Sequence, residues 1–188
     1  MRLLLDIQLV LLAIIVAFAA PEAVADNYDV VIYGGTSSGV TAAIEAARLG
    51  KSVAIVEPSQ HLGGMTTGGL SATDYGNKLA IRGLADEFYT RVGQAYGQGK
   101  TYYFEPKVAE SVIDQWVGSL PNIHVFTGEQ LNLSSGVSMT GNKINSISME
   151  NGHSLSGGVF IDASYEGDLM AHSGVNYIVG RESSATYG

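Results

Sequence analysis

A glycine-rich turn and a carboxylate that follows it have the residue types and the spacing that suit the binding of a dinucleotide. The turn comprises Gly34, Gly35, Thr36, Ser37, Ser38 and Gly39. The amides of such a turn, at the positive end of a helix dipole, attract a pyrophosphate. Glu57 lies 23 residues after Gly34 and is followed by Pro58; a carboxylate at this spacing accepts hydrogen bonds from ribose hydroxyls and repels a 2′-phosphate. Thr36 stands where a second glycine is usual, so we expect the backbone to approach the phosphates less closely.

The elements that must position these residues follow one another closely. Residues 29–33 form an apolar, β-branched run typical of a buried parallel strand. Residues 40–49 predict a helix that ends at Gly50, and residues 52–56 predict a second strand that leads to Glu57. This order favours a nucleotide-binding α/β domain over the alternative, an ordinary strand, glycine turn and helix without a ligand.

A second glycine-rich loop follows directly, at residues 61–70. It contains two Gly-Gly pairs, and the residues between them include Met65, Thr66 and Thr67. Paired glycines would let the main chain press against a flat ligand, and the threonines offer hydroxyl groups for its polar edge. The alternative is a flexible surface loop, but the position after Glu57 favours a role in binding.

The remaining chain predicts two helices and further strands. Apolar periodicity indicates a helix over residues 79–92, and Pro106 suits the first turn of another, with Trp116 on its buried face. We expect a strand over residues 122–126, and then an inserted three-stranded antiparallel meander. Its expected parts are strands over residues 130–139 and 143–149 and a third strand near Ser154, reached through Asn151-Gly152. A buried strand over residues 159–164 and a helix over residues 166–172 complete the expected elements.

Composition limits the partners and the chemistry. The 188 residues carry a net charge of -8, and no cluster of lysine and arginine occurs, which argues against nucleic acid and anionic membranes as partners. The chain has no cysteine, which excludes a reactive thiol, a cysteine-linked flavin and structural disulfides. We identify no metal-ligand spacing and therefore expect no metal site.

The amino-terminal residues 1–25 predict a secretory signal peptide. An apolar run over residues 9–20 ends at Pro21, and Ala23-Val24-Ala25 is a small-residue cleavage pattern. The run is too short to span a bilayer comfortably, and no twin arginine is present. We therefore expect export by the Sec route, a secreted or periplasmic protein, and no membrane association after cleavage.

Catalytic side chains are not identifiable from the sequence. Asp74 and Tyr75, after the second glycine loop, are candidates, and His172 is a weaker one. His124 and His153 fall in a predicted strand and beside a predicted turn, which favours structural roles. The aromatic residues 102–104 are consistent with a pocket wall but are more typical of packing.

With these residues in order, the chain resembles the FAD domain of the FAD-dependent oxidoreductases that have a glutathione-reductase-like, Rossmann-type fold. Two stretches sharpen the resemblance to one bacterial branch, whose members are often exported: Gly63-Gly64-Met65-Thr66-Thr67-Gly68-Gly69 and Ile161-Asp162-Ala163-Ser164-Tyr165-Glu166-Gly167-Asp168-Leu169. The resemblance covers residues 28–187, and the family uses FAD to transfer hydride or electrons to or from a small molecule.

The resemblance implies a role for each matched position. Gly34 to Gly39 would hold the FAD pyrophosphate, and Glu57 would hold the adenosine ribose. Gly63, Gly64, Met65 and Thr66 would lie along the ribityl and isoalloxazine groups. Gln130 or Leu131 would face the adenine through main-chain atoms, and Ala163 and Ser164 would close the region around the pyrophosphate.

The resemblance also implies that residues 26–188 are the first part of a longer FAD-binding protein. Family members continue into a substrate domain and a final FAD-binding segment, so we expect this truncated chain to be inactive on its own. The alternatives are a non-catalytic dinucleotide-binding module and an NAD-dependent Rossmann dehydrogenase; the second glycine loop and the meander argue against the latter. Because His61 is one residue out of register with the flavin-linked histidine of some relatives, we expect non-covalent FAD. The substrate, the electron acceptor and the oligomeric state stay open.

Overall fold

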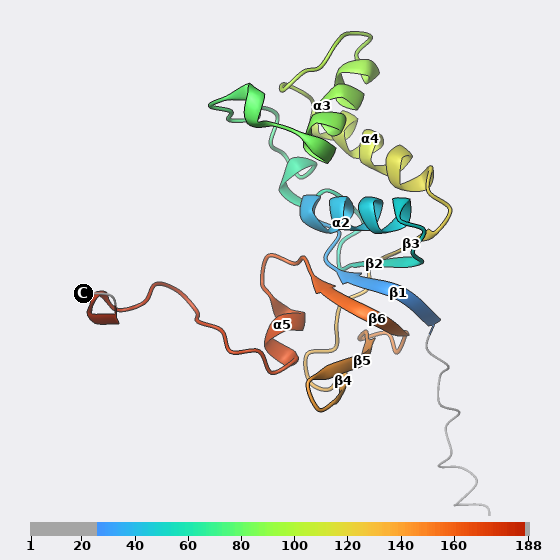
Figure 1. The fold of residues 1–188 in the computed structure, drawn as a ribbon, viewed down its shortest axis with the longest axis vertical. Helices are drawn as coiled ribbons and strands as arrows, with labels where there is room; N and C mark the ends of the chain where they lie inside the picture. The colour runs from blue at the N-terminus through green and yellow to red at the C-terminus, as the bar shows by residue number, and fades with distance from the viewer. Residues whose placement is uncertain (1–25, 187–188) are drawn as a thin grey trace, which may run out of the picture.

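The computed structural model describes residues 26–186, which form one six-stranded sheet with helices on its faces (Figure 1). The predicted signal peptide, residues 1–25, lies outside the described residues. The strands are β1 (Asp26–Tyr33), β2 (Val53–Glu57), β3 (Ile123–Thr127), β4 (Val137–Thr140), β5 (Lys143–Ser148) and β6 (Ser154–Asp162). The helices are α2 (Ser37–Arg48), α3 (Gly83–Ala95), α4 (Pro106–Gly118) and α5 (Asp168–His172), with short 3₁₀ turns at Gly64–Thr66, Lys78–Ala80 and Ser184–Thr186. The predicted α/β class is confirmed.

The strand order is β3-β2-β1-β6-β5-β4, with β1 near the centre. The strands β3, β2, β1 and β6 pair in parallel, and β6, β5 and β4 pair antiparallel. The carboxyl ends of β1, β2 and β6 therefore lie at one edge of the sheet. Ligands of open α/β sheets bind at this edge, because the connecting loops leave the strands there.

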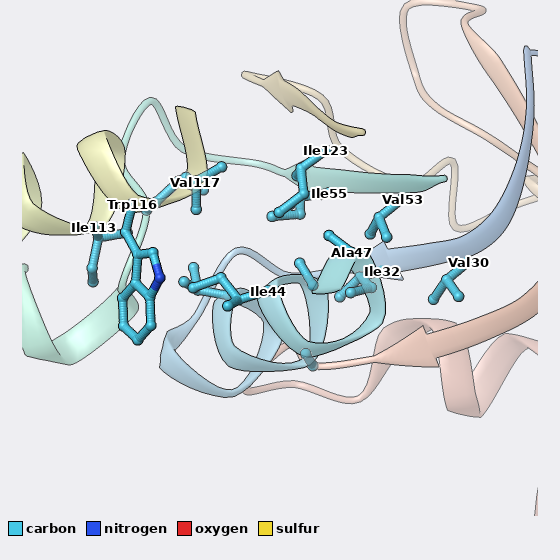
Figure 2. Close-up of a cluster of buried hydrophobic side chains, with 14 residues drawn as sticks. Val30, Ile32, Ile44, Ala47, Val53, Ile55, Ile113, Trp116, Val117 and Ile123 are labelled. Atoms are coloured by element: carbon cyan, nitrogen blue, oxygen red, sulfur yellow. The ribbon is translucent and has the colours of Figure 1, made fainter. Parts of the chain in front are cut away.

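Alternate residues of β1 enter two different cores because successive strand side chains point to opposite faces of the sheet. Val30 and Ile32 pack with α2 and α4 in the first core (Figure 2). Val31 and Tyr33 pack in the second core, against residues from the segment between β3 and β6. Trp116 is buried in the first core, as its place on the helical face predicts.

Charged residues join the pair α3 and α4 to α2. Glu87 in α3 accepts hydrogen bonds at 2.8 Å from Arg48 in α2 and at 2.7 Å from Arg91. Both guanidinium groups lie over the ring of Trp116, at 5.6 Å and 4.6 Å from its centroid. Cations over an aromatic face are attracted by its quadrupole. This network fixes α4 beside α2, which places the first turns of α4 next to the cleft described below.

The predicted helix over residues 79–92 begins later than expected. The chain has a 3₁₀ turn at Lys78–Ala80, and α3 begins only at Gly83. Ile81 and Arg82 have extended backbone angles, which a continuous helix does not permit. The Asn77 side chain accepts a hydrogen bond from the Leu79 amide and so stabilises the short turn instead. The last helix is also shorter than expected, since α5 begins at Asp168 rather than at residue 166.

The meander differs from the prediction in two respects. The predicted strand over residues 130–139 is paired over Val137–Thr140, because Asn132 folds the preceding residues into a turn. The expected third strand near Ser154 and the expected core strand over residues 159–164 are one continuous strand, β6. Gly157 does not interrupt it; a Cβ there would lie 2.8 Å from Val31 Cγ2, so the glycine permits close packing beside β1. Val159 in this strand is 54% exposed, whereas we expected it to be buried.

Candidate functional site

A cleft of about 730 Å³ opens at the edge where β1, β2 and β6 end. Its walls come from four parts of the chain: the turn after β1, the segment from the end of β2 to the second glycine loop, the first turns of α4, and the segment after β6. The lining residues are Gly34, Thr36, Glu57, Pro58, Ser59, His61, Gly64, Thr67, Gly68, Gly69, Pro106, Glu110, Ser164, Tyr165 and Glu166. The structure thus brings together predicted residues that are far apart in the sequence.

The glycine turn lets three parts of the backbone meet at the base of the cleft. Gly34 has a φ of +102°, and a Cβ there would lie 2.5 Å from the Ser164 nitrogen. A Cβ on Gly39 would lie 2.0 Å from the carbonyl oxygen of Gly34. Since backbone atoms cannot give way to such contacts, both positions require glycine. The first turn of α2 therefore lies directly against the end of β1, and it contains no acidic residue.

Thr36, at the position of the usual second glycine, holds the turn together. Its hydroxyl donates a hydrogen bond to the Ala163 carbonyl oxygen at 2.7 Å and lies 2.9 Å from the Ser38 hydroxyl. It also accepts from the Gly39 amide at 3.4 Å, so that Thr36 is the N-cap of α2. The side chain is buried. A threonine here ties the turn after β1 to the end of β6, a contact that the sequence pattern did not indicate.

Replacement of Thr36 by valine is expected to destabilise the protein by about 1–3 kcal/mol. The shape of the side chain is kept, but the Ala163 carbonyl oxygen loses a buried donor and α2 loses its cap. The free energy of unfolding in urea measures the effect. A matched control is Thr41→Val, because the Thr41 hydroxyl donates to carbonyl groups of its own helix. An equal effect of the two substitutions would contradict the role given to Thr36.

Glu57 lies in the cleft and organises the loops around it. Its Oε2 atom accepts a hydrogen bond from the Gly35 amide at 2.7 Å, and its Oε1 atom accepts from the Ser59 amide at 2.8 Å. Each carboxylate oxygen can accept a further hydrogen bond. Glu57 therefore fixes the glycine turn and keeps acceptor capacity for a ligand hydroxyl group.

The second glycine loop packs against the first. The Gly63 amide donates to the Gly35 carbonyl oxygen at 2.7 Å, and the Ser37 hydroxyl donates to the Gly63 carbonyl oxygen at 2.9 Å. The hydroxyls of Ser37 and Thr66 lie 2.6 Å apart. The Thr67 hydroxyl donates to the Leu62 carbonyl oxygen at 2.6 Å. The two threonine hydroxyls thus hold the loop, and the role expected for them at the polar edge of a ligand stays a prediction.

Some of the predicted cofactor residues, among them Ala163, Gln130 and Leu131, are not among the residues that line the cleft. Ala163 is buried below Ser164, and its amide donates to the Tyr33 carbonyl oxygen at 2.8 Å. Gln130 and Leu131 are not among the lining residues. The Leu131 amide donates to the Tyr33 hydroxyl at 3.2 Å, and the Gln130 carbonyl oxygen accepts from the Glu150 amide at 2.8 Å. These two main-chain groups therefore have partners within the protein, and the contact expected with adenine stays a prediction.

The candidate catalytic residues do not converge. Asp74 is exposed, and Tyr75 lies against Tyr102 and beneath the Lys78 ammonium, 4.2 Å from its ring centroid. Hydrogen bonds from Tyr103 and then from Lys78 lower the pKa of Tyr75. His172 is exposed at the end of α5. No group of three or more potential metal ligands occurs among residues 26–186.

The other histidines have partners in the protein. His124 lies 2.8 Å from the Tyr28 hydroxyl, and His153 lies 2.7 Å from Glu129, in keeping with the structural roles expected for both. His61 lines the cleft, with its Nδ1 atom 2.5 Å from Glu110 Oε1. Glu110 gave no signal in the sequence, because helical periodicity marks the buried face of α4 and not the side that faces a distant loop.

Comparisons with known proteins agree with this geometry. A family model described as FAD dependent oxidoreductase matches residues 29–188. A vinyl phenol reductase of Lactiplantibacillus plantarum is 45% identical over 51 residues, which cover 26% of this chain and 10% of the reductase.

Among residues 26–186, no helix is both long enough and apolar enough to span a bilayer.

Two solved structures show the same fold at low sequence identity. The L-proline dehydrogenase of P. horikoshii is 12% identical with a TM-score of 0.64, covering 84% of this chain and 58% of its own. The GidA-related protein of Thermus thermophilus is 17% identical with a TM-score of 0.52, covering 72% of this chain and 52% of its own. The chain thus spans little more than half the length of these structures.

Proposed function

The chain belongs to the FAD-dependent oxidoreductase family, whose cofactor is FAD, and we propose that its cleft binds FAD so that the flavin can exchange hydride or electrons with a small molecule. The observation that carries the proposal is the convergence of Gly34, Glu57 and the second glycine loop on one cleft. FAD supplies the redox chemistry, and the protein supplies position and electrostatics.

The residues present fit this cofactor. The first turn of α2 offers main-chain amides and contains no acidic residue of its own, which suits a pyrophosphate. Glycine at Gly34 and Gly64 lets the walls of the cleft meet closely, since a Cβ there would lie 2.5 Å from the Ser164 nitrogen or 2.2 Å from the Tyr165 hydroxyl oxygen. Glu57 would hold the adenosine ribose, and Gly63 to Thr66 would lie along the ribityl and flavin side.

We expect the purified chain to bind FAD without a covalent bond. His61, the first residue of the second glycine loop, is paired with Glu110 on α4. After loading with FAD and precipitation with acid, the flavin is expected in the supernatant, as measured by absorbance. Yellow colour retained in the pellet would contradict non-covalent binding, and a chain that takes up no FAD at all would contradict the proposed function.

A further inference from the structure

Tyr165 joins two walls of the cleft. Its hydroxyl oxygen accepts a hydrogen bond at 2.8 Å from the Met65 amide, 100 positions away in the chain. Tyr165 is 58% exposed and Met65 is 60% exposed. Since the Tyr165 side chain is more than half exposed, this hydrogen bond is its polar link from the segment after β6 to the second glycine loop.

The second glycine loop is shaped to accept this hydroxyl group. Gly64 has a φ of +55°, and a Cβ on it would lie 2.2 Å from the Tyr165 hydroxyl oxygen and 3.3 Å from the Thr36 Cα atom. Because Gly64 has no side chain, there is room for the Tyr165 hydroxyl group beside it. Gly64 and Tyr165 both line the cleft.

The segment that carries Tyr165 is held in a fixed conformation. Asp162 Oδ1 accepts hydrogen bonds from the Ser164 amide at 3.0 Å and from its hydroxyl at 2.7 Å. Asp162 Oδ2 accepts from the Met170 amide at 2.8 Å, and the Gly167 amide donates to the Ser164 hydroxyl at 2.9 Å. Since these bonds surround Tyr165 on both sides in sequence, its ring is presented from a preorganised loop.

We propose that Tyr165 is a positioning residue for FAD, which closes the cleft between the Gly34 turn and the second glycine loop and slows release of the cofactor. The inference rests on the proposed function. A cofactor that extends from Glu57 past the start of α2 toward Met65 passes the hydrogen bond between Tyr165 and the Met65 amide. A hydrogen bond that holds the two walls together must open before the cofactor leaves, so it acts on the dissociation rate.

The test is Tyr165→Phe in the full chain, which removes the hydroxyl group and keeps the ring. FAD dissociation, followed by flavin fluorescence after rapid dilution, is expected to accelerate roughly three- to tenfold, the range for loss of one hydrogen bond. The same hydrogen bond must open before FAD enters, so the association rate is expected to rise as well. The thermal unfolding midpoint without FAD is expected to change little, because the residue is exposed. Tyr177→Phe is the matched control, since Tyr177 is 55% exposed and is not among the lining residues.

The FAD dissociation rates of the wild type and of Tyr165→Phe distinguish failure of the inference from failure of the proposed function. Equal dissociation rates for the wild type and Tyr165→Phe would overturn the inference and leave the proposed function standing. Slower dissociation or tighter binding by the variant would also overturn it, because the tyrosine would then obstruct the cofactor. A wild-type chain that binds no FAD would contradict the proposed function and, with it, this inference.

Discussion

Replacement of Gly39 by leucine is expected to abolish FAD binding. The first side-chain atom would lie 2.0 Å from the Gly34 carbonyl oxygen and 3.2 Å from the Ala163 Cβ atom. The first of these neighbours belongs to the backbone, so the start of α2 must move away from the end of β1. This movement takes the amides of the turn away from the position that we propose for the pyrophosphate. The visible absorbance of bound flavin in the purified protein measures the loss.

The control for this substitution is Gly118→Leu at the end of α4. Gly118 is exposed and has open space around an added Cβ, without a positive φ. We expect this variant to bind FAD as the wild type does. Circular dichroism of both variants shows whether the fold is kept. Stoichiometric FAD in Gly39→Leu would mean that the pyrophosphate does not lie at the start of α2.

The second large effect is expected for Glu57→Gln. The substitution removes the charge that strengthens a hydrogen bond from ribose, and it turns an NH₂ group toward the Gly35 or Ser59 amide, which both need acceptors. The binding free energy of FAD is expected to weaken by about 1.5–3 kcal/mol, or roughly 10- to 150-fold in Kd. A fluorescence titration measures this change.

Glu150→Gln is the matched control, because Glu150 is exposed after β5 and does not line the cleft. Its Kd for FAD is expected to equal that of the wild type. If Glu57→Gln also bound FAD with unchanged Kd, the carboxylate would serve the protein loops alone. A measurement of unfolding without FAD separates these two roles, since loss of loop support lowers stability in the absence of the ligand.

Local patterns in the sequence were sufficient to predict the nucleotide-binding unit. One short segment contains in turn the strand β1, the glycine turn, the helix α2 and the strand β2. Its apolar runs and glycine positions indicate each of these elements from neighbouring residues alone. Gly50 is an example: a glycine was expected to end the helix, and Gly50 follows α2 with a φ of +78°. The same reasoning applies to Pro106 at the start of α4 and to the buried Trp116.

Only the tertiary structure decided which residues complete the cleft. The bond from Thr36 to Ala163 joins positions 127 apart, and Glu110 reaches the site because α4 is held against α2 and α3. Neither periodicity nor turn chemistry carries information about such pairings, because both describe neighbours along the chain. The single strand β6 is a further case, since pairing with β1 and β5 joins the two strands that were expected near Ser154 and over residues 159–164. Hence the sequence by itself determined the segment that we propose binds the dinucleotide, whereas long-range packing decided the walls of the cleft around it.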